Sequence, residues 1–170
     1  MWVNAGLSTR ERILRFRNEH ASKNIVLSAV PKAVGFYAKC GFKLSDNKIN
    51  YCIIHNPKPA DTIEALGLNE IGPVSQDNMK KISEYDRGIS LIDRLKYLSK
   101  WLLTPICQSY AVFDQQGRCV GYACFRVVDK YIKVQPLFAD SVQIASHLMQ
   151  HYLANNSSVI FLKLAVLNAD

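Results

Sequence analysis

The sequence predicts an α/β protein of the α+β type, in which strands and helices are interspersed along the chain. Two observations predict this class. Short apolar runs rich in Val, Ile and aromatic residues are interspersed with amphipathic helical segments along the chain. Residues 108–128 also contain two such runs around a polar turn, which is the pattern of a β-hairpin.

The first third of the chain predicts a helix, a strand, a second helix and a hairpin. Pro31 and Gly41 occupy positions typical of a helix start and a helix end. Ser8 or Thr9 can cap the first helix. The expected elements are a helix at 8–20, a buried strand at 24–30, a helix at 31–40 and a hairpin over 43–55 with its turn at Asp46-Asn47.

The remainder of the chain follows a polar stretch with two prolines at 56–62. Ser75 is expected to cap the first helix of this part, and Asp140 or Ser141 its last helix. The expected elements are a short strand near 66–71, helices at about 75–86 and 90–103, the hairpin at 108–128, a strand at 131–138, a helix at 141–154 and a final strand at 158–168. Because the helix–strand pair at 8–30 resembles the pair at 141–167, the sequence predicts a degenerate duplication with a period of about 135 residues.

The composition excludes several classes of protein. With 170 residues, 49% of them apolar and 21% charged, the chain has the make-up of an ordinary globular protein. No apolar run reaches the roughly 18 residues needed to span a bilayer, and the N-terminus has no apolar signal core. The five cysteines stand singly at irregular spacing. We therefore expect reduced thiols in a cytoplasmic or nuclear protein and no disulfide framework.

The net charge of +7 is concentrated at the start of the chain. Residues 1–55 hold nine Lys and Arg against three Asp and Glu, whereas the remaining residues hold twelve against eleven. Such a segment fits an anionic partner, either a phosphate-bearing cofactor, an acidic protein or nucleic acid, and it equally fits a solvated helix face. No nucleic-acid-binding motif appears.

Two segments carry a resemblance to the Gcn5-related N-acetyltransferase (GNAT) superfamily. In that family a short helix of the form N-x-x-A-x-x-F-Y-x-K-x-G-F follows a strand, and residues 30–42 read VPKAVGFYAKCGF, with Val30 in place of the Asn. Gly121-Tyr122, Arg126 and the run YIKVQPLFADSVQIASHLMQHYL resemble the C-terminal domain of tandem acetyltransferases. The resemblance implies a GNAT fold, in which a mixed, mostly antiparallel sheet is flanked by helices to give three layers, in a degenerate tandem copy. It assigns residues 1–55 to the C-terminal half of a first domain, 56–65 to a linker, and 66–170 to a second domain lacking its last helix and hairpin.

The resemblance also implies an activity, the transfer of an acetyl group from acetyl-CoA to a primary amine of a small molecule or peptide, or else a truncated remnant of an enzyme with this activity. Positioning supplies much of the rate, and a backbone N–H polarises the thioester carbonyl. By resemblance Tyr37 is the acid that protonates the leaving thiolate, with a packed aromatic side chain as the alternative. The pyrophosphate is expected at a helix N-terminus. The implied cofactor-binding residues are Gly6, Leu7 and Ser8 in the first copy and Val134, Pro136, Ala139 and Ser141 in the second.

Several features leave other functions open. Asp140 stands where the family has a glycine-rich phosphate loop and would repel a phosphate, which favours a non-catalytic acyl-CoA-binding or regulatory module. His147 and His151 lie four residues apart, but the pattern lacks the Glu of a zinc-protease helix, so no metal site is expected. Glu84, Asp86 and Asp93 lie in helices that border the substrate groove in the family, and a solvated face is the simpler interpretation for each. Sheet edges left by the incomplete copies favour self-association.

Overall fold

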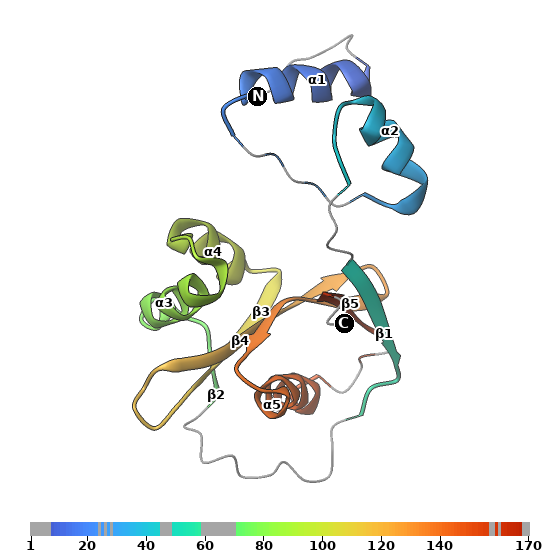
Figure 1. Ribbon diagram of the computed structural model, residues 1–170. Helices are drawn as coiled ribbons and strands as arrows, with labels where there is room; N and C mark the ends of the chain where they lie inside the picture. Colours follow the sequence, from blue (N-terminus) through green and yellow to red (C-terminus); the bar gives the residue numbers. More distant parts are fainter. Residues whose placement is uncertain are drawn as a thin grey trace. The chain divides into compact units, whose positions relative to one another are not determined.

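The computed structural model describes residues 8–23, 25, 27, 29–44, 49–58, 71–156, 159 and 161–167. The chain forms two compact units, Met1–Lys48 and Ile49–Asp170. Figure 1 shows the elements of each unit in the colours of the sequence. Among the described residues no helix is long and apolar enough to cross a membrane.

The first unit contains two helices, α1 (Thr9–Glu19) and α2 (Val34–Lys39), the second opening from a 3₁₀ turn at Pro31–Ala33. Helix α1 ends at Glu19 and α2 ends just before Cys40 and Gly41. Gly41 has φ +84°, a backbone conformation that favours glycine, and the Arg17 guanidinium occupies the space where a Cβ would lie. Arg17 Nη1 donates to the carbonyl of Cys40 at 2.7 Å and thereby joins the two helices.

The predicted buried strand at 24–30 is wrong for the residues of this stretch that the structure describes. Ile25, Leu27, Ala29 and Val30 are not in a strand, and Leu27 and Val30 are 37% and 57% exposed. The physical reason is that a strand needs a hydrogen-bonded neighbour, and the described part of the first unit holds none. Residues 43–44 are likewise not in a strand, and the expected turn at 46–47 lies outside the described residues.

The second unit is built on one sheet of six strands in the order β1-β6-β5-β4-β3-β2. All neighbours are antiparallel except β5 and β6, which run parallel. This confirms the predicted mixed, mostly antiparallel sheet. The strands are β1 (Ile49–His55), β2 (Ile71–Pro73), β3 (Cys107–Phe113), β4 (Cys119–Val128), β5 (Tyr131–Ala139) and β6 (Phe161–Leu167).

Strand β1 belongs to the sheet of the second unit, although the predicted boundary at residue 55 groups it with the first segment. It pairs antiparallel with β6 along its whole length, with Cys52 opposite Leu164. The pairing satisfies backbone groups that would otherwise be left on one edge of β6. The interpretation of the two segments as copies of one domain stays a prediction.

Helices cover both faces of the sheet, and Figure 1 shows α5 opposite α3 and α4. Helix α5 (Val142–Ala154) packs Leu148 and Tyr152 onto a core that includes Phe125, whose ring stacks on Tyr152 at 4.0 Å between centroids. Helices α3 (Met79–Ser90) and α4 (Leu95–Leu102) enclose a second core around Tyr122 on the other face. From Tyr122 to Phe125, alternate residues of β4 therefore face different helix layers, with Tyr122 and Cys124 under α3 and α4 and Ala123 and Phe125 under α5.

The start of α3 corrects the prediction that Ser75 is its cap. The N-cap position is Asn78, and its side chain bonds the preceding loop and not the helix. Asn78 Oδ1 accepts from the Ser75 N–H at 2.9 Å, and Asn78 Nδ2 donates to the Pro73 carbonyl at 2.9 Å. Residues 76–78 thus form a turn, and the helix begins at Met79.

Candidate functional site

The candidate site begins where strands β5 and β6 part. Their parallel pairing runs from Ile132 opposite Leu162 to Val134 opposite Leu164. Beyond Val134, strand β5 continues to Ala139 and remains paired with β4 alone. One edge of β5 over residues 135–139 therefore carries backbone groups that β6 does not engage, and an extended ligand could pair with them.

A bulge lies at the point where the strands part. Phe125 pairs with Val134 and Ala123 with Leu137, so Gln135 and Pro136 together stand opposite one residue of β4. The Gln135–Pro136 peptide is cis. Pro136 has no N–H, so the donors nearest the bulge are those of Gln135 and Leu137. The Gln135 carbonyl accepts from the indole N–H of Trp101 at 3.3 Å.

The N-terminus of α5 follows directly on β5. Ser141 is the N-cap and its Oγ accepts from the Ile144 N–H at 3.2 Å, which confirms one of the two predicted caps. Gly121 of β4 lets the helix approach the sheet, because a Cβ there would lie 2.8 Å from Ile144 Cγ2 and 3.1 Å from the Phe138 carbonyl. The free N–H groups of the first helical turn are thus held beside the end of β5.

Asp140 places a negative charge at this helix N-terminus. Its carboxylate is exposed and accepts from the Tyr85 hydroxyl at 2.9 Å, which ties α3 to the end of β5. Burial and the neighbouring Asp140 carboxylate both raise the pKa of Tyr85 above its ordinary value. Tyr85 therefore stays a neutral donor, and Asp140 opposes a phosphate at the same helix end.

A buried carboxylate organises the α3–α4 side of the sheet. Asp86 is 1% exposed and accepts from Arg94 Nε at 2.6 Å, Arg94 Nη2 at 2.7 Å and the Tyr122 hydroxyl at 2.5 Å. Burial by itself would raise the pKa of Asp86, but the hydrogen bonds from Arg94 and Tyr122 outweigh it and lower the pKa. A carboxylate with these hydrogen bonds and a lowered pKa stabilises the structure and is a poor general base.

The other two candidate bases are placed differently. Glu84 is exposed on α3. Asp93 Oδ1 accepts from the N–H of Leu95, the first residue of α4, at 3.0 Å. Neither is directed by any hydrogen bond toward the parting of β5 and β6.

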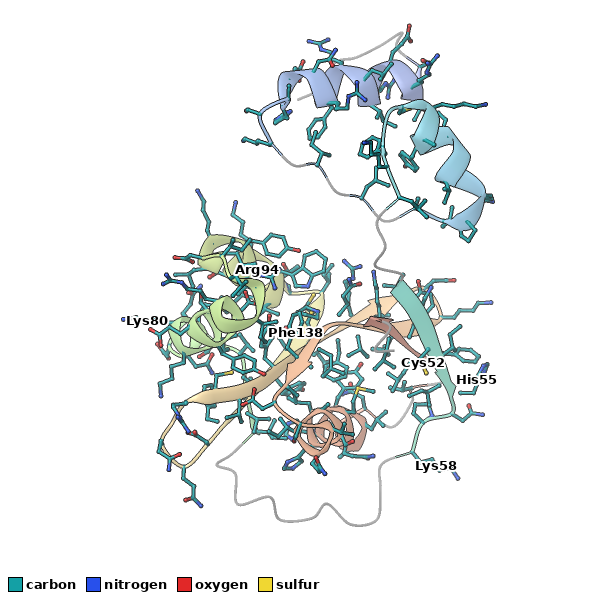
Figure 2. All side chains as sticks on the ribbon, in the orientation of Figure 1. Cys52, His55, Lys58, Lys80, Arg94 and Phe138 are labelled. Carbon is teal, nitrogen blue, oxygen red and sulfur yellow. The ribbon has the colours of Figure 1, made fainter. Side chains whose placement is uncertain are left out.

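Two stacked aromatic rings with a cation at each end form a row from α4 to the sheet, and the sequence reasoning missed it. The Arg94 guanidinium lies 6.0 Å from the Tyr97 ring, Tyr97 stacks on Trp101 at 5.9 Å, and the Arg126 guanidinium lies 5.3 Å from the Trp101 ring. The spacing of Tyr97 and Trp101, four residues apart on a helix, was the available signal. Figure 2 labels Arg94, the residue before α4, and Phe138 of β5, whose ring lies 5.7 Å from the Tyr122 ring.

The predicted residues of the first segment lie in the first unit. Tyr37 is half-buried on α2, edge-on to the rings of Phe36 at 5.3 Å and Phe42 at 5.9 Å. Its role as an acid stays a prediction. Gly6 and Leu7 lie outside the described residues.

Ser8 is committed to capping α1. Its N–H and Oγ both donate to Glu11 Oε2 at 2.7 Å, and its Oγ accepts from the Glu11 N–H at 3.4 Å. The Ser8 hydrogen bonds lower the pKa of Glu11. A carboxylate of the chain itself thus takes the place that a phosphate would take at this helix end.

No group of three or more His, Cys, Asp or Glu within the described ranges could hold a metal ion. His147 and His151 lie on α5, and burial together with His147 lowers the pKa of His151. The His151 ring packs edge-on against Tyr110 at 4.8 Å.

A family model described as an acetyltransferase (GNAT) domain matches residues 82–169, just over half of the chain. The chain therefore belongs to the GNAT acetyltransferase family, as the two sequence segments predicted. The match covers the site from α3 through the bulge and α5 to β6. No curated protein matches the chain.

Solved structures show the same fold at low sequence identity. A GCN5-related N-acetyltransferase from Kribbella flavida has a TM-score of 0.63 and 13% identity, over 95% of this chain and 40% of that one. A probable N-acyltransferase from Enterococcus faecalis V583 has a TM-score of 0.60 and 15% identity, over 93% of this chain and 42% of that one. A tandem GNAT protein from the clavulanic acid biosynthesis pathway has a TM-score of 0.58 and 13% identity, over 85% of this chain and 52% of that one. The chain thus spans about half or less of the length of these three proteins.

Proposed function

We propose that the protein is an acyltransferase that uses acetyl-CoA to acetylate a primary amine. The observation that carries this is the parting of β5 from β6 after Val134, directly beside the bulge and the α5 N-terminus. In this proposal the pantetheine arm of acetyl-CoA pairs with the free edge of β5 over 135–139. Val134, Pro136, Ala139 and Ser141 are the residues of β5 and the α5 cap along that path.

The chemistry asked of the chain is modest. The N–H groups of Gln135 and Leu137 are the donors available at the bulge to polarise the thioester carbonyl. The amine nitrogen bonds to the acyl carbon, the C–S bond breaks with its electron pair on sulfur, and the amine proton is lost. Tyr37 stays our proposed donor of a proton to the thiolate. A cytoplasmic or nuclear location stays part of this proposal, on the single and irregularly spaced cysteines of the sequence.

A second candidate is a non-catalytic acyl-CoA-binding or regulatory module. Two observations favour it, the missing N–H of Pro136 at the bulge and the Asp140 carboxylate at the α5 N-terminus. The missing N–H removes a donor that could stabilise negative charge on the thioester carbonyl oxygen. The Asp140 carboxylate weakens the attraction of the helix N-terminus for the pyrophosphate.

Calorimetry with acetyl-CoA and a thiol-release assay with a panel of amines test the two candidates. The enzyme binds acetyl-CoA and releases thiol only when an amine is present, and the module binds without release. Tyr37→Phe is expected to slow turnover and leave binding intact, with Tyr110→Phe as the matched control. Unchanged turnover in Tyr37→Phe removes Tyr37 from the mechanism, and absence of heat at millimolar acetyl-CoA contradicts both candidates.

A further inference from the structure

Three cations lie side by side across the middle of the sheet. Arg126 of β4 is directly opposite Lys133 of β5, and Lys133 is directly opposite Lys163 of β6. They share one face of the sheet. Val134 and Leu162, their chain neighbours, belong to the core under α5, so Lys133 and Lys163 point to the face on which α3 and α4 pack.

Like charges directly opposite each other in a sheet are destabilising. The ion pairs found among the described residues are Arg15–Glu19, Arg94–Asp86 and Arg118–Asp114, and none of them neutralises Arg126 or Lys133. Both side chains are half-buried. The Arg126 guanidinium lies over Trp101, and the Lys163 ammonium lies 5.5 Å from the Tyr131 ring. A bound anion would offset the repulsion between Arg126 and Lys133, because each cation would be attracted to the anion.

This pair of cations borders the point where the strands part. Lys133 immediately precedes Val134, the last residue of β5 paired with β6. Trp101, which lies beneath the Arg126 guanidinium, bonds the Gln135 carbonyl at the bulge. Helix α5 and its core fill the opposite face of the sheet. An acceptor that approaches the bulge from the face on which α3 and α4 pack therefore passes Arg126 and Lys133.

We propose that the acceptor is an amine that also carries an anionic group, a carboxylate or a phosphate, bound by Arg126 and Lys133. The inference rests on the proposed acetyl transfer and names its substrate class. Attack requires the neutral amine, and two neighbouring cations lower the pKa of an amine because they disfavour its charged form. The same cations repel acceptors with additional positive charge, such as polyamines and lysine-rich peptides. The amine gains the acyl carbon, the thioester sulfur keeps the electron pair of the broken bond, and the proton lost from nitrogen ends on sulfur.

Matched acceptor pairs test the inference with the full chain. Phosphoethanolamine is compared with ethanolamine, and L-alanine with L-alaninamide, by thiol release at saturating acetyl-CoA. We expect kcat/KM to favour an anionic member by at least about tenfold, the size of one charge-assisted hydrogen bond. The pair that shows the larger preference identifies phosphate or carboxylate as the anion. Arg126→Gln and Lys133→Gln should each reduce that preference about tenfold, whereas Lys130→Gln, the same change on the exposed β4–β5 turn, should not.

A direct binding measurement separates this inference from the proposed function. Calorimetric titration of phosphoethanolamine and L-alanine is carried out on the wild type and on the three variants, whose folding is checked by circular dichroism. Binding that is weakened in Arg126→Gln and Lys133→Gln but not in Lys130→Gln supports the anion site even if no thiol is released. Equal use of charged and neutral acceptors, or no binding of either anionic amine, overturns the inference. Failure of acetyl-CoA to bind overturns the proposed function alone.

Discussion

At the residue scale, Asp86 is the side chain on which the α3–α4 layer depends. Its buried carboxylate accepts hydrogen bonds from two nitrogens of the Arg94 guanidinium and from the Tyr122 hydroxyl. It thereby joins α3, the start of α4 and β4. Such a bidentate, hydrogen-bonded arrangement compensates for the cost of burying the charge only while every member is present.

Asp86→Asn is therefore expected to lower the free energy of unfolding by about 3 kcal/mol at pH 7, since it leaves the Arg94 charge without its partner. The pKa of Asp86 is lower in the folded than in the unfolded state, so the unfolded state binds more protons at acid pH. The contribution is present above the unfolded pKa of about 4 and is lost as the pH falls below it. Urea unfolding of both proteins should give a smaller difference at pH 3 than at pH 7. Glu84→Gln, exposed on the same helix, should change stability little, and an equal loss in Glu84→Gln would contradict the argument.

Asp140 is the residue that sets the charge at the candidate pyrophosphate position. Asp140→Asn should keep an acceptor for the Tyr85 hydroxyl and remove the negative charge from the α5 N-terminus. We expect the Kd for acetyl-CoA to fall about two- to fivefold, and the gain to shrink in 1 M salt. Calorimetry measures the Kd at low salt and in 1 M salt, with Asp129→Asn in the exposed β4–β5 turn as the control. Weaker binding in Asp140→Asn would show that the carboxylate does not face the phosphate.

At the element scale, β1 is the feature that joins residues near the start of the chain to the last strand. It is an edge strand, and its sequence INYCIIH contains neither charge nor proline, the usual protections of an exposed edge. Ile53 and Ile54 are 54% and 38% exposed, and Figure 2 labels Cys52 and His55 along the strand. Self-association through this edge stays our proposal.

Antiparallel pairing of two β1 strands over Ile49–His55 places Cys52, the central residue, opposite Cys52 of the second copy. A short bis-maleimide should therefore link two chains covalently, as seen on a denaturing gel. Cys52→Ser should abolish the product, and Cys107→Ser should retain it. Ile53→Lys should lower the yield because it sets like charges near each other across the strands. A yield unaffected by Cys52→Ser rules out this pairing.

At the scale of the whole molecule, the two units differ in how much they bury. Within the described part of the first unit Cys40 is the one buried side chain, and α1 has none. The second unit holds both hydrophobic cores, one on each face of its sheet. Since tertiary packing supplies most helical stability in proteins, the helices of the two units should differ in local stability.

Native-state hydrogen exchange measures this difference directly. Amides of α1 are expected to exchange at least about 100-fold faster than those of α3 and α5, after correction for intrinsic rates. The reason is that α1 buries no side chain fully, since Ile13 and Leu14 are only half-buried, so few apolar contacts oppose its opening. Equal protection of α1 and α5 would mean that contacts beyond those within each unit stabilise the first unit.

The elements that the sequence predicted well are those with local signals. The hairpin of β3 and β4 forms around Gly117, whose φ of +73° fits the glycine in its turn, and Ser141 caps α5 as expected. The elements it missed depend on distant partners. The stretch 24–30 has strand composition but no neighbouring strand among the described residues, and β1 finds its partner β6 more than a hundred residues away.

The sequence by itself determined the family and the mixed sheet with its helical layers, whereas the cofactor residues from Val134 to Ser141, implied by the family resemblance, stay a prediction. The family and the sheet follow from periodicity, caps and short motifs, which act over a few residues. Only the tertiary structure decided that β1 is the edge strand beside β6 in the sheet of the second unit. The same holds for the hydrogen bonds of Asp86 with Arg94 and Tyr122 and for the pairing of Arg126 opposite Lys133. Strand register and side-chain partners arise from contacts between segments far apart in the chain, and no local pattern encodes them.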